Sequence, residues 1–364
     1  MKRKIKLFDP VVTGKEIRYI KDILKSGFWA SGAGTGYVLD FEKKFQKYIG
    51  AKECVAVNSG TAALHLALST MNLENQEVII PSLSFVSTAH AVLYNKAKPV
   101  FVDVDPKTLC LDVTEVEKKI TKKTKAILPV HFAGIPANLA YLTKLARDSK
   151  INLIEDASHA CGAKYGGKKI GTHNEIICFS FHPVKNLSMP TEGAITLNGK
   201  FAKKRKNMLN SLRWCGIDNR KGVFYDVPRL GWNYYMNEFS AAIGLKQLKK
   251  LETMNSRRRS VAKMYHKGIS FEHKSPISKD SCYHLYWICI KNRSEFIKFM
   301  NKSNIEVGVH YKPVHLMSAY KRSTSLPVTE SLWTELVSIP MHANLTDFQV
   351  KYVIEKINEF YNKN

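Results

Sequence analysis

The sequence contains no long hydrophobic run and no closely paired cysteines. No stretch approaches the roughly 18 uninterrupted apolar residues that span a bilayer, and Asp9 and Pro10 interrupt any signal-peptide core that would follow the basic residues 2–4. The seven cysteines, at positions 54, 110, 161, 178, 215, 282 and 289, have neither the spacing of a zinc site nor that of a redox pair. These absences predict a cytoplasmic protein with reduced thiols, no membrane partner and no metal site.

Acidic residues are also scarce. The chain has 31 Asp and Glu against 56 Lys and Arg, a formal net charge of +25, which predicts attraction to phosphates, nucleic acid or acidic surfaces. Basic runs such as 203–206 and 257–259 are nevertheless interleaved with apolar residues at helical spacing, which is typical of solvated helix faces. Because helix-turn-helix, zinc-finger and RNA-binding signatures are absent from the sequence, a nucleic-acid-binding protein is the less favoured alternative.

The length and composition indicate a globular α/β protein of about two domains. The chain has 364 residues, of which 45% are apolar and 24% charged, and apolar runs alternate with amphipathic stretches as in repeated βα units around a mostly parallel sheet. The predicted strands cover residues 54–57, 77–80, 99–102, 126–130, 152–154, 176–179 and 194–197. The predicted helices between them cover residues 61–70, 84–94 and 137–149.

The second half of the chain predicts a long helix and a smaller domain. Apolar residues recur at helical spacing from Asn237 to about residue 268, where Gly268 is the first breaker. Beyond it, short strands mix with helical segments over 293–304 and 346–361, which is typical of an α+β unit. We therefore expect a large domain over residues 1–250 and a smaller C-terminal domain over 251–364.

Three chemically informative segments follow predicted strands, where open parallel sheets bind ligands. The small and hydroxylated residues 58–64 (NSGTAAL) open a helix whose N–H groups can hold a phosphate, although an ordinary helix cap has the same composition. Asp156 follows the strand over 152–154, and Lys185 lies in a proline-containing loop after the strand over 176–179. A phosphate cradle, a strand-end acid and a loop lysine in this order are the parts of a pyridoxal 5′-phosphate (PLP) site.

These segments belong to a larger set of motifs through which the chain resembles the DegT/DnrJ/EryC1/StrS family of PLP-dependent sugar aminotransferases. The resemblance covers nearly the whole chain. In order, the motifs are 26–32 (SGFWASG), 58–64 (NSGTAAL), 81–85 (PSLSF), 99–105 (PVFVDVD), 155–160 (EDASHA), 180–186 (SFHPVKN), 231–234 (GWNY), 241–248 (AAIGLKQL), 309–315 (VHYKPVH) and 338–342 (SIPMH). The resemblance implies a fold-type I PLP-dependent transferase.

The resemblance also implies roles for individual residues. Lys185 would be the catalytic lysine that forms a Schiff base with the cofactor. Asp156 would pair with the pyridinium nitrogen, His159 would lie near the phenolic oxygen and Phe85 would stack on the ring.

Other motif residues would bind the cofactor phosphate. Gly60, Thr61 and Ser180 would hold the phosphate of their own subunit, and Asn233 would reach the phosphate of the neighbouring subunit. The family's homodimer, with active sites shared between subunits, would then be required for activity.

The implied reaction moves an amino group from glutamate to a keto sugar linked to a nucleoside diphosphate. His310, Tyr311 and His315 match the C-terminal substrate-facing motif, and Trp29 is a candidate for the cavity entrance. Alternatives left open are a keto-cyclitol acceptor and a catalytically silent regulatory or nucleic-acid-binding protein on the same fold. A branch that dehydrates sugars has histidine in place of the lysine, so Lys185 argues against it.

Two departures from the family pattern affect the expected specificity. Tyr235 stands where many members have arginine after Asn-Tyr, and Ala194 stands where many have a second glycine after Glu-Gly. The sequence therefore leaves open whether C3 or C4 of the sugar is aminated.

Overall fold

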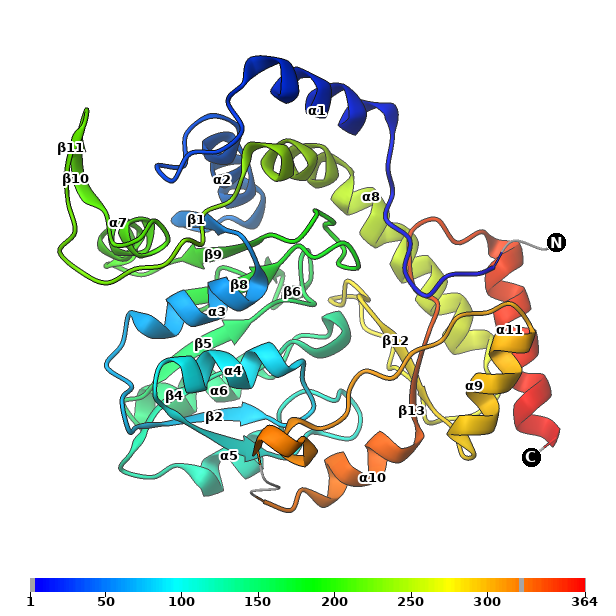
Figure 1. The fold of residues 1–364 in the computed structure, drawn as a ribbon. Helices are drawn as coiled ribbons and strands as arrows, with labels where there is room; N and C mark the ends of the chain where they lie inside the picture. Colours follow the sequence, from blue (N-terminus) through cyan, green and yellow to red (C-terminus); the bar gives the residue numbers. More distant parts are fainter. Residues whose placement is uncertain (1–3, 321–323, 364) are drawn as a thin grey trace.

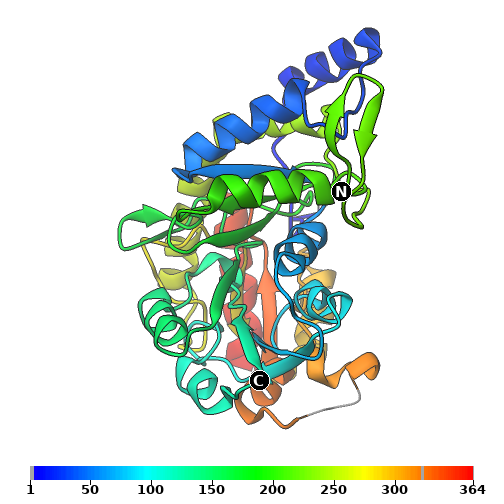
Figure 2. The same cartoon turned by 90° about the vertical axis from the view of Figure 1, so that its left-hand side faces the viewer.

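A central sheet flanked by helices on both faces organises the first two thirds of the chain (Figures 1 and 2). The computed structural model describes residues 4–320 and 324–363. Within them, seven strands lie in the order β1-β9-β8-β5-β4-β2-β3, and β9 is antiparallel to both of its neighbours while the other pairs are parallel. The strands are β1 (Glu53–Val57), β2 (Glu77–Pro81), β3 (Lys98–Val102), β4 (Thr124–Ile127), β5 (Asn152–Asp156), β8 (Ile176–Ser180) and β9 (Gly193–Leu197).

The alternation of side chains along each strand explains the two layers of helices. Val55 and Val57 of β1 face one core, whereas Cys54 and Ala56 face the other. The first face is covered by α3 (Gly60–Ser69), α4 (Val86–Tyr94) and α7 (Ala202–Leu212), and the second by α2 (Gly36–Ile49), α5 (Val113–Lys119), α6 (Leu139–Asp148) and the first half of α8 (Glu238–Gly268). Burial on both faces accounts for the continuous apolar runs in the sequence.

The α/β architecture with a mostly parallel sheet is therefore confirmed. The strand expected over 126–130 ends at Ile127, although Val130 still makes a bridge to Asp156; Pro129 has no N–H to donate to a ladder. The helix expected from residue 84 begins at Val86, with Phe85 at its N-cap.

The C-terminal part of the chain forms its own core around the second half of α8. Val261 and Tyr265 of α8 pack with Phe296, Ile339 and Ile357. The surrounding elements are β12 (Tyr286–Cys289), α9 (Arg293–Lys302), β13 (Leu336–Ile339) and α11 (Asp347–Lys363). The helix α10 (Pro327–Glu335) precedes β13, and its Leu332 packs against the core that contains Val116 of α5. Along α8, side chains as far as Met254 pack in the core beside the sheet, and those from Val261 onward pack in the C-terminal core. A domain boundary near residue 250 remains our proposal.

Several peripheral elements were not predicted. The helix α1 (Gly14–Ser26) packs on α8, and the hairpin β10–β11 (Asp218–Lys221 and Phe224–Asp226) projects from the large domain (Figure 1). A second small hairpin consists of β6 (Lys164–Tyr165) and β7 (Lys168–Lys169). The seven cysteines are free thiols and only Cys215 is exposed. No helix in the described part of the chain is long and apolar enough to cross a bilayer.

Candidate active site

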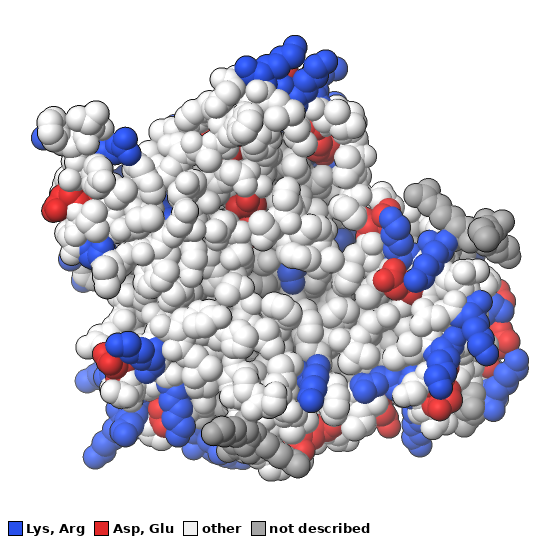
Figure 3. Space-filling view, viewed as in Figure 1, with Lys and Arg blue, Asp and Glu red and all other residues white. Residues whose placement is uncertain are grey.

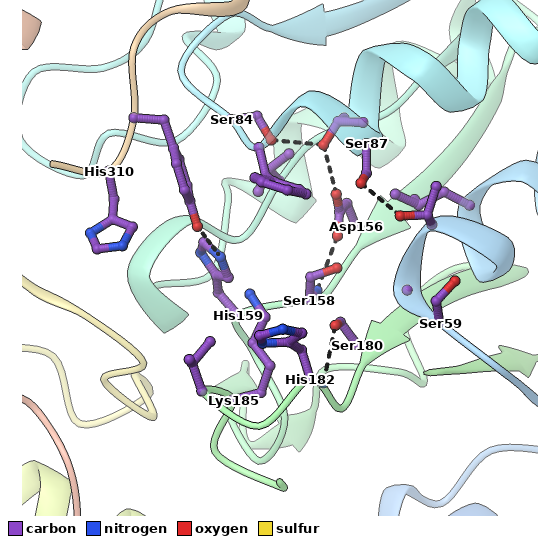
Figure 4. Close-up of a pocket in the computed structure, with 18 of the residues that line it drawn as sticks. Ser59, Ser84, Ser87, Asp156, Ser158, His159, Ser180, His182, Lys185 and His310 are labelled. Atoms are coloured by element: carbon purple, nitrogen blue, oxygen red, sulfur yellow. Dashed lines mark hydrogen bonds between the residues drawn. The ribbon is translucent and has the colours of Figure 1, made fainter. Parts of the chain in front are cut away.

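A cavity of about 340 Å³ lies at the carboxyl ends of the parallel strands (Figure 4). Asp156 is the last residue of β5 and Ser180 the last of β8, so both side chains meet at one edge of the sheet. The cavity brings together nine of the predicted site residues, namely Gly60, Thr61, Phe85, Asp156, His159, Ser180, Lys185, His310 and Tyr311.

Lys185 projects into the cavity from a tight loop after β8. Its backbone N–H donates to the His182 carbonyl at 2.8 Å, and its carbonyl accepts from the Ser188 hydroxyl at 2.7 Å. The next residue, Asn186, donates to Asn255 Oδ1 at 2.7 Å and to the Cys282 carbonyl at 2.8 Å, which anchors the loop to α8. Burial lowers the pKa of Lys185 to about 8, while the Asp156 carboxylate opposes this shift. A substantial fraction of the amine is therefore neutral near physiological pH.

Asp156 is held in place by two donors. Thr88 Oγ1 donates to Asp156 Oδ2 at 2.9 Å, and the Ser158 N–H donates to Oδ1 at 3.0 Å. Ser84 Oγ lies 2.7 Å from Thr88 Oγ1 and extends the network (Figure 4). These contacts orient a carboxylate toward the cavity, where it can pair with a protonated ring nitrogen.

His159 lies between the cavity and the C-terminal part of the chain. Its Nδ1 accepts from the Ala133 N–H at 3.3 Å, and burial, followed by the charge of Lys185, holds its pKa well below the usual range. The neutral ring therefore carries its proton on Nε2, which lies 3.2 Å from the Tyr311 hydroxyl oxygen. Because Tyr311 accepts this bond, its own hydroxyl hydrogen is available to a ligand in the cavity.

The opposite side of the cavity forms an anion cradle at the start of α3. Ser59 caps the helix by accepting from the Ala62 N–H, which leaves the N–H groups of Gly60 and Thr61 without acceptors inside the helix. A Cβ placed on Gly60 would lie 2.6 Å from the Ser180 Cβ, so only glycine permits this close approach of α3 to β8. The helix dipole and these N–H groups suit a phosphate.

Three predicted site residues lie outside this cavity. Trp29 is 52% exposed and packs on Phe239 with ring centroids 5.9 Å apart. Asn233 is exposed, and its carbonyl accepts from Asn58 Nδ2 at 3.3 Å. His315 is completely buried, where its ring lies 2.5 Å from Ser82 Oγ and 3.1 Å from Glu330 Oε1.

The structure also places residues at the site that the sequence did not indicate. His284 packs against His159 with ring centroids 4.4 Å apart, and Phe8 stacks on His284 at 5.6 Å with an interplanar angle of 13°. Phe8 and Thr88 line the cavity as well. Phe8 and His284 each come from a segment far from residue 159 in the chain, so no local pattern could have identified them.

The cavity residues fit PLP. The cradle with no room for a Cβ at Gly60 suits the phosphate, the oriented carboxylate of Asp156 suits the ring nitrogen, and the partly neutral amine of Lys185 suits the aldehyde carbon. The aromatic ring of Phe85, which is 54% exposed, lies at the mouth of the same cavity.

Comparisons with known proteins agree with this geometry. The model of the DegT/DnrJ/EryC1/StrS aminotransferase family matches residues 10–358. The chain is 35% identical over 368 residues to GDP-perosamine synthase of Escherichia coli O157:H7, with 98% of each protein covered.

Solved structures show the same similarity. The chain aligns with Spr1654 of Streptococcus pneumoniae in its PLP form with a TM-score of 0.93 and 26% identity over 99% of both chains. It aligns with PseC of Helicobacter pylori, an aminotransferase involved in pseudoaminic acid biosynthesis, with a TM-score of 0.93 and 25% identity over 100% of both chains. The protein is a PLP-dependent enzyme that belongs to the DegT/DnrJ/EryC1/StrS aminotransferase family.

Proposed function

We propose that this enzyme transfers an amino group from glutamate to a keto sugar linked to a nucleoside diphosphate. The observation that carries the proposal is the meeting of Lys185, Asp156 and the Gly60 cradle in one cavity. Relatives named GDP-perosamine synthase in Escherichia coli and Caulobacter vibrioides, at 35% and 33% identity, support a nucleotide-linked acceptor.

Different residues of the cavity would bind different parts of the cofactor. The N–H groups of Gly60 and Thr61, with the Ser180 hydroxyl, would hold the phosphate, and Asp156 would accept a hydrogen bond from the protonated ring nitrogen. His159 would lie near the phenolic oxygen, and Phe85 would stack on the ring. Bound PLP supplies an electron sink that acidifies the C–H bond next to the substrate nitrogen.

Lys185 then acts as the proton carrier of both half-reactions. Its neutral Nζ would take the proton from the α-carbon of glutamate and hold it for return to the bound cofactor, and the same amine would move a proton in the opposite direction when the sugar is aminated. A pKa near 8 suits this dual role, because the amine can gain and lose a proton at physiological pH.

The substrate side of the cavity is formed by the segment that contains His310 and Tyr311. We assign sugar contacts to these two residues, of which Tyr311 has a free hydroxyl hydrogen to donate. The ring of His315, which contacts Ser82 and Glu330, supports this segment from behind. Trp29 is assigned to the cavity entrance of a neighbouring subunit.

A homodimer is part of the same proposal. Val223, Phe224 and Leu230, in and beside the projecting β10–β11 hairpin, are 80%, 79% and 90% exposed. Apolar surface of this extent on a projecting hairpin indicates a protein partner, and a second copy would also bring Asn233 to the neighbouring phosphate. Replacing Phe224 and Leu230 by Asp should convert the dimer to a monomer in sedimentation velocity, whereas an unchanged sedimentation coefficient would exclude this surface.

The reaction is tested by following the visible absorption of the PLP-loaded enzyme. Adding glutamate should remove the band of the lysine-bound cofactor and release 2-oxoglutarate, while Lys185→Ala should do neither. The aminated enzyme is then mixed with nucleotide-linked keto sugars and, separately, with a keto-cyclitol, and the products are identified by mass spectrometry. Amination of the cyclitol alone, or no response to glutamate, would contradict the proposal.

A further inference from the structure

A second hollow lies between α1 and α8, apart from the sheet-end cavity. Its volume is about 410 Å³, and the charged residues that line it are Lys15, Glu16, Arg18, Lys246, Lys249 and Lys250. We refer to it as the α1–α8 hollow. It shares no lining residue with the cavity that contains Lys185. Lys and Arg side chains gather over α1 at this end of the molecule (Figure 3).

The single carboxylate of the hollow is already occupied. Glu16 Oε1 lies 2.5 Å from Lys250 Nζ, and its Oε2 accepts from the Thr13 hydroxyl at 2.5 Å. Although burial opposes the shift, hydrogen bonds from Lys250 and Thr13 lower the pKa of Glu16 to about 2. Glu16 therefore remains ionised and neutralises Lys250 alone.

The other cations of the hollow have no acidic partner. Lys15, Arg18, Lys246 and Lys249 form no ion pair within 4 Å with any residue that the structure describes, so their four positive charges remain uncompensated. Asp22, one turn further along α1 than Arg18, does not line the hollow.

The positive charges around the hollow also affect the pKa of Tyr19, which lines it. The Lys246 ammonium lies 3.4 Å from the centre of the Tyr19 ring. A hydrogen bond from Lys246, together with its charge and those of Lys249 and Lys44, lowers the pKa of the Tyr19 hydroxyl. Two of these lysines lie on α8 and line the hollow, and Lys44 lies nearby on α2.

Basic composition alone does not produce such a hollow. In a second basic depression, lined by Lys52, Lys168 and Lys169, two of the three ammonium groups are directed to protein oxygens: Lys52 donates to the Gly199 carbonyl at 3.3 Å and Lys169 to the Tyr48 carbonyl at 2.8 Å. In the α1–α8 hollow, Lys15, Arg18 and Lys249 make no side-chain hydrogen bond within the described residues. Their donors remain available to a ligand.

We propose that the α1–α8 hollow binds a small anion that carries at least two phosphate groups. A single phosphate group carries at most about two negative charges at neutral pH, which is fewer than the four uncompensated positive charges of the hollow. A diphosphate carries about three negative charges and matches them more closely. Arg18 offers a planar donor fork and the lysines act as point charges. The bound anion bridges α1 to α8 and holds the two helices together.

Pyrophosphate is the probe for this site, titrated calorimetrically into the PLP-loaded full-length enzyme at low salt. The test variant is Lys246→Gln/Lys249→Gln. The matched control is Lys263→Gln/Lys267→Gln, which removes two exposed lysines of the same helix outside the hollow. We expect one pyrophosphate per chain, binding weakened at least about tenfold in the test variant and little changed in the control. Hydrogen exchange of α1 should slow when pyrophosphate is added.

Four results would overturn the proposal. These are the absence of pyrophosphate binding, equal weakening in both variants, equally tight binding of orthophosphate, and binding of single-stranded RNA without binding of pyrophosphate. Pyrophosphate that enters the sheet-end cavity would bind the test variant unchanged, which also contradicts this site. The visible PLP spectrum verifies that both variants are folded, and the outcome is independent of which substrate the enzyme aminates.

Discussion

Replacing Gly60 by alanine should weaken PLP binding more than it weakens the fold. The new methyl group would lie 2.6 Å from the Ser180 Cβ and 3.2 Å from its Cα, whereas ordinary contacts of this kind begin near 3.4 Å. The start of α3 must therefore move away from β8 by several tenths of an ångström. Overpacking of this kind costs about 1–3 kcal/mol of the free energy of unfolding.

The same movement displaces the N–H groups of Gly60 and Thr61 from the phosphate. A hydrogen bond to a charged group contributes about 1.5–3 kcal/mol, so loss of one such bond should raise the dissociation constant of PLP roughly 10- to 150-fold. The assay is an absorbance titration of the cofactor-free protein with PLP, alongside urea unfolding.

A control variant separates the local effect from a general effect of alanine. Gly14→Ala adds a methyl group that meets no atom within 4 Å and should change neither quantity. Adding Ser180→Gly to Gly60→Ala removes the closest contact and should restore part of the stability. A Gly60→Ala enzyme that binds PLP within threefold of the unaltered protein would refute the cradle.

Four further predictions concern stability, pH and the rate of the reaction. Arg213→Leu removes the ionic partner that lies 2.5 Å from the buried Glu42 carboxylate, and should lower the free energy of unfolding in urea by about 3–5 kcal/mol. The control Arg205→Gln breaks a partly exposed ion pair with Glu175 and should lower it by under about 1 kcal/mol. Similar losses in the two variants would contradict the importance of the buried pair. In the cofactor-free protein, burial holds the pKa of Lys185 near 8, below the value of about 10.4 in the unfolded chain. Acetylation of Lys185, measured by mass spectrometry, should therefore rise with pH around 8. Between these two pKa values the unfolded chain binds more protons, so the free energy of unfolding should increase with pH. Asp156→Asn should lower that midpoint, because the carboxylate raises the pKa of Lys185, and an unchanged midpoint would exclude the coupling. Asn255→Leu removes the acceptor of the Asn186 amide and should lower kcat for the reaction with glutamate at least about tenfold, with little change in KM. A change in KM alone would contradict a role of Asn255 in positioning the Lys185 loop.

The sequence predicted most of the sheet and the chemical centre of the site. Strands such as 54–57 and 176–179 were found within a residue or two because burial on both faces leaves continuous apolar runs bounded by polar turns. Gly60, Asp156 and Lys185, which the structure places around one cavity, were singled out because each lies within a few residues of the end of a predicted strand.

The remaining features depend on contacts between distant segments. His315 belongs to the same short motif as Tyr311, but only the fold shows that its ring turns toward Ser82 and away from the cavity. Phe8 and His284 reach His159 through tertiary packing. The β10–β11 hairpin, which carries the exposed Val223 and Phe224, is short and mostly exposed, so it has no buried face that a periodic pattern could reveal.

The helix α8 restricts how the two parts of the enzyme can move. Its 31 residues extend about 46 Å, and one uninterrupted helix contributes Ala241 to the core beside the sheet and Tyr265 to the C-terminal core. Midway along it, Asn255 holds the loop that follows Lys185. A hinge cannot form within a continuous helix without breaking its hydrogen bonds, so α8 should hold the two cores at a fixed distance. Substrate entry and product release should then depend on movement of the loops around the cavity.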